Sequence, residues 1–204
     1  MLVSLLAAAF ALVSPQFGAG GSLAGAPIWN RDGCTGANRS PALRWAQPPA
    51  QTKSFALGIF DPDAGPAGWW HWIVYDIPAE RRALAAALPA ESPDVKQGVN
   101  DFGVVGYGGP CPPPGPAHHY VFTLYALDIA HLAAPAQLHG QAFVELVRPH
   151  IIASATLSGI YQNQRRSAPA IRRLPSLVVK AASPREGAAA FHPGLTLDVL
   201  AGLR

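Results

Sequence analysis

Charged residues and long apolar runs are both scarce in this chain. Asp, Glu, Lys and Arg make up 13% of its 204 residues, against about a quarter in an average globular protein. No apolar stretch approaches the roughly 20 residues that a membrane-spanning helix needs. The net charge of +3 is uneven, because residues 165–204 hold seven Lys/Arg against two Asp/Glu and the remainder holds eight against ten. A mildly acidic remainder argues against a nucleic-acid-binding core.

Common catalytic and metal-binding motifs are also missing. The chain has no GxSxG, HExxH, Walker or GxGxxG pattern, and its two cysteines do not form a CxxC pair, which disfavours the corresponding enzymes, zinc ribbons and thioredoxin-type sites. We therefore expect a non-catalytic protein without a metal or cofactor. A hydrolase using Asp61 and His71 as acid and base stays an alternative, although no motif places a nucleophile.

Proline and glycine are abundant, with 21 and 20 residues, and predict many turns between short strands. Runs rich in β-branched and aromatic residues predict the strands, and the fold class is mainly β, an antiparallel sandwich with Greek-key connections. One C-terminal helix and one short helix complete it. The expected strands are 42–45, 53–60, 72–77, 120–127 and 151–161, and the expected helices are 79–88 and 135–150.

The stretch LGIFDPDAGPAGWWHWIVYD, residues 57–76, has polar groups where two strands meet a loop. Asp61 and Asp63 come at the end of one strand, and His71 begins the next among three tryptophans. Carboxylates and an imidazole walled by indoles are typical of a small binding pocket. Taken alone, Asp61 also fits a turn former and His71 a buried structural histidine.

A second stretch, GYGGPCPPPGPAHHYVFTLYAL from residue 106, again brings histidines and a tyrosine to a strand entrance. Strand alternation sends His118 and His119 to opposite faces, so only one can easily line a pocket. Glycines at 108 and 109 allow close backbone approach to a ligand, and the prolines predict a rigid, preorganised loop. Two imidazoles, a phenol and loop N–H groups suit a small anion.

These motifs, together with SPALRW at 40–45, resemble the phosphatidylethanolamine-binding protein family, also called Raf kinase inhibitor-like proteins, in its secreted bacterial branch. The resemblance covers roughly residues 14–164. It implies a pocket for a small anion or a phosphorylated or phospholipid headgroup, with His118 rather than His119 facing the ligand. The ligand-binding residues it implies, with their loop neighbours, are Asp61, Asp63, His71, Tyr107, Gly109, Pro110, Pro112, His118 and Tyr120.

The family names also imply an alternative, a protein-interaction module that inhibits a kinase or protease. A homodimer is a further possibility. We expect no nucleic-acid partner.

Cys34 and Cys111 are expected to form a disulfide between an N-terminal turn and the pocket loop, because secreted bacterial members carry cysteines at these places. Two unrelated buried thiols are the alternative. A disulfide requires an oxidising compartment, which predicts a periplasmic or secreted protein, with a cytoplasmic one as the alternative.

The domain boundaries follow from composition. Residues 1–11 are apolar and end in Ala9-Phe10-Ala11, an A-x-A cleavage pattern, and predict a signal peptide without its basic start. The alternative is a buried first strand that runs on into residues 13–17. Residues 12–164 form the ligand-binding domain, and residues 165–204 are a basic tail rich in Ala, Pro and Arg, expected to be flexible.

Overall fold

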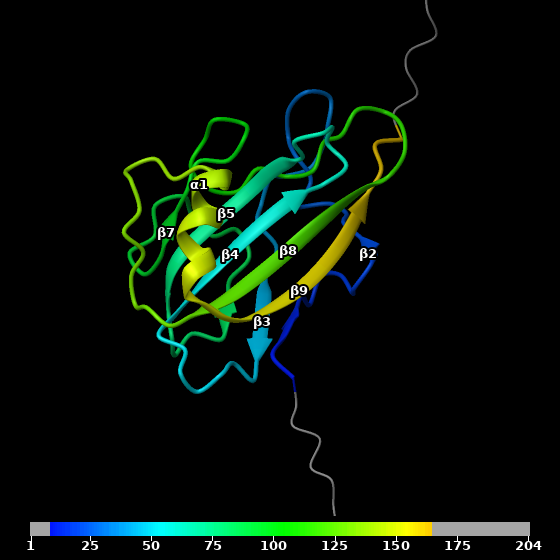
Figure 1. Cartoon of the computed structure of the whole chain (residues 1–204). Coiled ribbons are helices and arrows are strands. Elements are labelled where there is room, and N and C mark those ends of the chain that lie inside the picture. Colours follow the sequence, from blue (N-terminus) through cyan, green and yellow to red (C-terminus); the bar gives the residue numbers. More distant parts are fainter. Residues whose placement is uncertain (1–8, 165–204) are drawn as a thin grey trace, which may run out of the picture. The chain divides into compact units, whose positions relative to one another are not determined.

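The computed structural model of the protein describes residues 9–164, so the tail and most of the predicted signal peptide lie outside the described residues. Within these residues the chain forms two sheets and one α-helix, arranged as in Figure 1. The elements are β1 (Ala11–Val13), β2 (Gly21–Ser22), β3 (Leu43–Ala46), β4 (Ser54–Asp61), β5 (Trp69–Pro78), β6 (Ala83–Leu84), β7 (Lys96–Gln97), β8 (His118–Leu127), α1 (Gly140–Val147), the 3₁₀ turn η1 (Arg148–His150) and β9 (Ile151–Tyr161).

The smaller sheet has the order β1-β3-β6, and the larger has the order β2-β9-β8-β4-β5-β7. Every pairing is antiparallel except that of β2 with β9. The mainly β sandwich is therefore confirmed, whereas the Greek-key connections stay a prediction.

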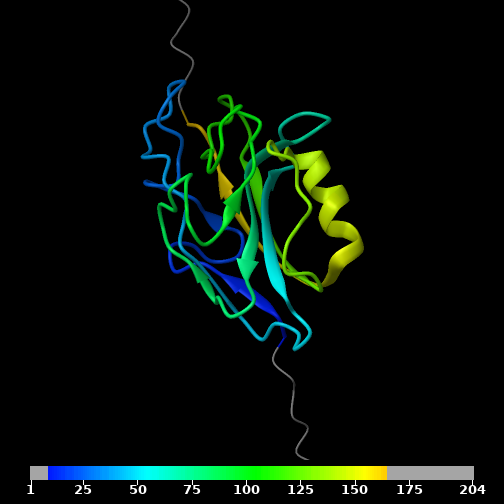
Figure 2. The ribbon, with the colours of Figure 1, turned by 90° about the vertical axis from the view of Figure 1, so that its left-hand side faces the viewer.

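The larger sheet is covered on both faces, as Figure 2 shows, by the smaller sheet on one side and by α1 on the other. Trp72 and Val74 of β5 join the core between the sheets, while Ile73 and Tyr75 join the cluster beneath α1. This two-sided cover explains why β4 and β5 are continuously apolar instead of alternating. Strand β8 lies inside the larger sheet, but only one of its faces is fully buried.

The predicted helix at 79–88 is wrong. Ala83 and Leu84 form strand β6, which pairs with β3, and Leu84 is buried against the core. Farther along, Ser40 binds two backbone N–H groups of this segment. Its carbonyl oxygen accepts from Ala87, and its hydroxyl oxygen accepts from Leu88. The alanines favour a helix locally, but burial of Leu84 and pairing with β3 outweigh that preference.

The C-terminal helix is confirmed but is shorter than the predicted 135–150. It begins at Gly140, since the carbonyl of Leu138 accepts a bond from Val99 outside the helix, and it passes into the 3₁₀ turn at Arg148. Phe143 and Val147 form its buried face. Within residues 9–164, no helix is long and apolar enough to cross a membrane.

Candidate functional site

The polar ends of three neighbouring strands meet at one cavity of about 510 Å³. Strand β4 ends at Asp61, directly opposite Trp69 of β5, and β8 begins at His118 beside them. The lining residues are Asp61, Asp63, Ala64, Gly65, Trp69, His71, Phe102, Cys111, Pro112, Pro113, Pro114, Gly115, Pro116, His118 and Tyr120. Asp61, His71 and His118, distant in sequence, thus share one cavity.

Asp61 fixes the orientation of His118. Asp61 is buried, with 2% of the residue's surface exposed, and its Oδ2 lies 2.8 Å from Nδ1 of His118. Its Oδ1 accepts the backbone N–H of Asp63 at 2.8 Å. A carboxylate accepts, so Nδ1 of His118 carries the proton, and Nε2 is the ring nitrogen left for a ligand.

His71 is held by the loop that faces it. Its Nδ1–H donates to the carbonyl oxygen of Gly108 at 2.7 Å, and the N–H of Gly108 donates back to the carbonyl of His71 at 2.8 Å. Burial lowers the pKa of His71, and this effect exceeds the opposing bond to Gly108 and the attraction of Asp61 and Asp101. The ring is therefore neutral at pH 7, with Nε2 as an acceptor.

Two polar groups on the cavity wall are buried without a hydrogen-bond partner among residues 9–164. They are the hydroxyl of Tyr120 and the indole Nε1 of Trp69. Burial raises the pKa of Tyr120, and the nearby Asp61 carboxylate adds to the rise. Both groups can donate a hydrogen bond, but both atoms are fully enclosed by the surrounding side chains, so they belong to the wall and do not face the cavity.

His119 lies outside the cavity, as strand alternation predicted, with 59% of its side chain exposed. Its backbone N–H and its Nδ1 both contact Oδ2 of Asp63, at 2.7 and 2.8 Å. These hydrogen bonds lower the pKa of Asp63. Asp63 therefore sits at the rim, with its carboxylate engaged by a surface histidine.

Three expected site residues lie behind the cavity wall. The hydroxyl of Tyr107 donates to the carbonyl of Pro27 at 2.9 Å, and the carbonyl of Pro110 accepts from Trp29 at 3.1 Å. A Cβ on Gly109 would collide with the carbonyl of Pro27. Their positions give all three a role in fastening the loop to residues 27–38, so the missing Cβ at Gly109 makes room for the protein's own backbone.

Sequence reasoning missed Phe102 and Asn38. Phe102 lines the cavity, stacks on Trp29 with ring centroids 4.4 Å apart and meets His71 edge-on. Asn38 accepts the N–H of Gly109 at 2.7 Å. The Asn38 backbone is left-handed, with φ of 49°, a conformation that asparagine tolerates better than most residues. That tolerance was the one local signal available in the sequence.

The disulfide between Cys34 and Cys111 is confirmed, with Cα atoms 5.9 Å apart. Cys111 opens the proline loop over the cavity. Farther along, the carbonyl of Pro112 accepts from Asn163 at 3.0 Å and that of Gly115 accepts from Gln162 at 2.8 Å. The loop is thus fastened by a covalent bond and two side-chain hydrogen bonds, which agrees with the predicted preorganisation.

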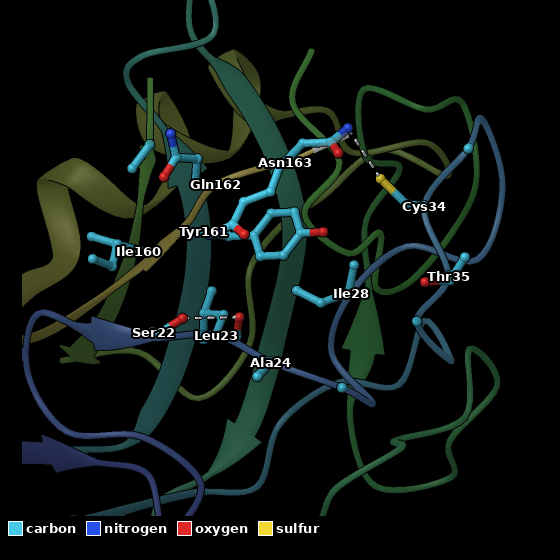
Figure 3. A pocket seen from close by; sticks show the side chains of 15 residues that line it. Ser22, Leu23, Ala24, Ile28, Cys34, Thr35, Ile160, Tyr161, Gln162 and Asn163 are labelled. Carbon is cyan, nitrogen blue, oxygen red and sulfur yellow. Dashed lines mark hydrogen bonds between the residues drawn. The ribbon is translucent and has the colours of Figure 1, made fainter. Parts of the chain in front are cut away.

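A larger hollow of about 640 Å³ lies on the Cys34 side of the disulfide. Figure 3 shows that its labelled side chains come from the end of β9, the two residues after it and the segment from Ser22 to Thr35. Hydroxyl, amide and apolar groups line it, without a histidine, carboxylate, lysine or arginine. Among the described residues it therefore lacks a histidine or a charged side chain to pair with an anion, and the smaller cavity is the better candidate site.

A model of the family described as phosphatidylethanolamine-binding protein matches residues 13–162. This chain belongs to the phosphatidylethanolamine-binding protein family. The UPF0098 protein YbcL of Escherichia coli K12 is 37% identical over 169 residues, covering 78% of this chain and 91% of YbcL. The UPF0098 protein YbhB of the same strain is 38% identical over 155 residues, covering 74% and 98%.

The fold agrees with this family assignment. The crystal structure of E. coli YbcL, described as a new member of the mammalian PEBP family, superposes with a TM-score of 0.71 at 36% identity. The match covers 76% of this chain and 99% of that structure. The resemblance drawn from the sequence motifs is therefore confirmed.

Proposed function

We propose that the protein is a non-catalytic binding protein whose cavity takes a small anion, in particular a phosphorylated headgroup. The observation that carries this proposal is the convergence of His71, His118 and Tyr120 on one cavity walled by Trp69 and prolines. Membership of the phosphatidylethanolamine-binding protein family supports the same ligand class.

Calorimetric titration with O-phosphoethanolamine tests the proposal. We expect saturable heat for the full chain and a loss of about tenfold or more in affinity for His118→Ala, because this variant removes the ring that Asp61 orients at the cavity. His150→Ala is the matched control. His150 also pairs with an aspartate, Asp128 at 2.9 Å, but does not line the cavity. Absence of heat with phosphate esters, or equal heat in His118→Ala, contradicts the proposal.

The same samples separate binding from hydrolysis. The names of the family and of its relatives indicate no catalytic activity. We therefore expect the phosphoethanolamine in the titration cell to remain intact, as judged by a phosphate-release assay. Release that disappears in His71→Ala would support the Asp/His hydrolase instead.

We also propose that the protein works in an oxidising compartment. The Cys34–Cys111 disulfide supports this location, because cytosolic thiols are kept reduced. Fractionation of cells that express the full chain, with thiols alkylated at lysis, tests it. We expect the protein outside the cytoplasm with both cysteines protected, and a cytoplasmic, fully alkylated protein contradicts it.

A further inference from the structure

The larger hollow, on the Cys34 side of the disulfide, has an apolar floor. Leu23, Ile28 and Cys34 line it and are buried. The ring of Tyr161 is half-buried and packs against the core, and Figure 3 shows it in the middle of the labelled side chains. An aromatic ring that is held by the core and reaches a hollow offers a ligand a flat apolar surface.

The rim of the hollow carries neutral hydrogen-bonding groups. Thr35, Gln162 and Gln164 line it and are exposed. The amide of Gln162 donates through Nε2 to the carbonyl of Gly115 at 2.8 Å, which leaves its Oε1 as an acceptor, while the hydroxyl of Thr35 can both donate and accept. No charged side chain among residues 9–164 lines the hollow.

Bonds within the protein hold the lining segments together. The disulfide joins Cys34 to the proline loop, and the amide of Asn163 donates to the carbonyl of Pro112 at 3.0 Å. The N–H of Leu23 donates to the carbonyl of Ile160 at 2.7 Å. Because these bonds already fix the segments relative to one another, a ligand in the hollow would not have to order them.

We propose that the larger hollow is a second binding site, whose ligand is a neutral sugar. A sugar ring has an apolar C–H face that stacks on the ring of Tyr161, and edge hydroxyl groups that donate and accept hydrogen bonds at the rim. The volume of about 640 Å³ lies within the range of roughly 300–1,000 Å³ for small-molecule pockets. The hollow shares no lining residue with the cavity at Asp61, so the two sites are distinct.

Two other classes of ligand match the hollow less well. A charged ligand would lose its hydration there without gaining a charged partner among the described residues, which is costly. A purely aliphatic ligand would cover the hydroxyl of Thr35 and the amide oxygen of Gln162 without bonding to them, and covered polar groups that lose water are also costly. A neutral sugar avoids both costs.

Saturation-transfer NMR on the full chain tests the site, with maltose, cellobiose and N,N′-diacetylchitobiose as probes. The three sugars are uncharged and differ in the orientation of their hydroxyl groups. We expect saturable transfer to the ring C–H protons of at least one of them, with a dissociation constant of about 1 mM or less. Absence of saturable transfer to all three overturns the inference.

Variants of the floor and the rim locate the bound sugar. Tyr161→Ala removes the stacking surface and should cost about tenfold or more in affinity, whereas Tyr161→Phe keeps the ring and should retain most of it. Tyr125→Ala is the matched control, because Tyr125 is also half-buried but lines neither the hollow nor the cavity. It should bind the sugar as the wild type does.

Thr35→Trp keeps the test decisive if Tyr161→Ala fails to fold. Thr35 is exposed, so this variant should keep the wild-type midpoint of urea unfolding while its indole fills part of the hollow. We expect the sugar to bind about tenfold or more weakly. Sugar binding that survives in every folded variant lies elsewhere on the protein and overturns the inference.

The charge of the ligand provides a separate readout. The sugar that binds is compared at pH 7 with its uronic-acid counterpart, in which one CH2OH group has become a carboxylate. The two ligands share their rings and differ by one negative charge. We expect the neutral sugar to bind about tenfold or more tightly, because the hollow offers the carboxylate no charged partner. Equal affinities overturn the assignment of the hollow to neutral sugars.

Discussion

Two buried tyrosines near the cavity differ in what their hydroxyl groups contact. The hydroxyl of Tyr107 donates to the carbonyl of Pro27, whereas that of Tyr120 is buried without a partner among the described residues. Removing a hydrogen-bonded hydroxyl leaves its buried carbonyl partner without a donor. Removing an unpaired hydroxyl instead removes the desolvation cost of burying it. We expect Tyr107→Phe to lower the free energy of unfolding by about 1–3 kcal/mol.

Tyr120→Phe should leave that free energy unchanged or raise it by up to about 1 kcal/mol. Urea unfolding of both variants measures the two free energies. Each variant serves as the control for the other, since both lose one hydroxyl from a buried ring. A Tyr120→Phe protein as destabilised as Tyr107→Phe would show that its hydroxyl is bonded.

Burial of His71 also predicts a pH dependence of stability. The pKa of His71 is lowered from its usual 6.5, so below about pH 6.5 the unfolded chain binds a proton that the folded chain does not. The free energy of unfolding should therefore fall as the pH drops below 6.5, by at most about 1.4 kcal/mol per pH unit for this group.

Urea unfolding at intervals from pH 5 to pH 7.5 tests this slope, and His71→Asn should flatten it. The lowered pKa of Asp63 acts near and below its usual 3.8, so it loses its stabilising effect only in more acidic solution. A slope unchanged by His71→Asn would assign the pH dependence to another group.

The roles of single residues could be predicted from the sequence where one local rule decides which way a side chain points. Alternation along β8 separates His118 from His119, and the structure places them on opposite sides as expected. The sequence was uninformative where a residue's role depends on a distant partner. Tyr107 and Gly109 look like pocket residues in the chain, and only the approach of residues 27–38 shows that they fasten the loop.

Helix α1 begins at a glycine for a reason of packing. A Cβ on Gly140 would collide with the indole of Trp70, and Trp70 also packs edge-on against Phe143. Helix propensity favours alanine over glycine by about 1 kcal/mol, whereas overpacking costs about 1–3 kcal/mol. We expect the cost of the collision to exceed the gain in helix propensity, so Gly140→Ala should lower the free energy of unfolding by up to about 2 kcal/mol.

Urea unfolding measures this change, with Gln141→Ala as the control on the exposed side of the same turn. That variant should stay within about 0.5 kcal/mol of the wild type. A stabilised Gly140→Ala would mean that Trp70 moves aside without cost.

The elements themselves were predictable in proportion to their length. The long strands have 8 to 11 residues and strong apolar patterns, and they were found with boundary errors of a few residues. The two-residue strand β6 has no pattern of its own. It exists because β3 offers an unpaired edge and Leu84 has a core to enter, and neither fact is local to residues 79–88.

The whole molecule is cross-linked by a single disulfide across 77 positions of sequence. Closing a loop of that length restricts the unfolded chain by about 4 kcal/mol in the chain-entropy model. For a protein of this size, that corresponds to a fall of roughly 10 °C in Tm when both cysteines are replaced. Because Cys111 begins the loop over the cavity, the replacement should also weaken phosphoethanolamine binding.

Thermal unfolding of wild type and of Cys34→Ala/Cys111→Ala, each with and without reductant, tests this prediction. Reductant should lower the Tm of the wild type to that of the double variant and leave the variant unchanged. The Asn163 and Gln162 bonds to the loop persist without the disulfide, so the reduced protein should stay folded at room temperature and bind more weakly instead of not at all. The contrary result is a reduced wild-type protein that keeps the Tm of the oxidised protein although thiol titration finds both cysteines free. It would show that the two sheets and the cavity hold their arrangement without the covalent bond.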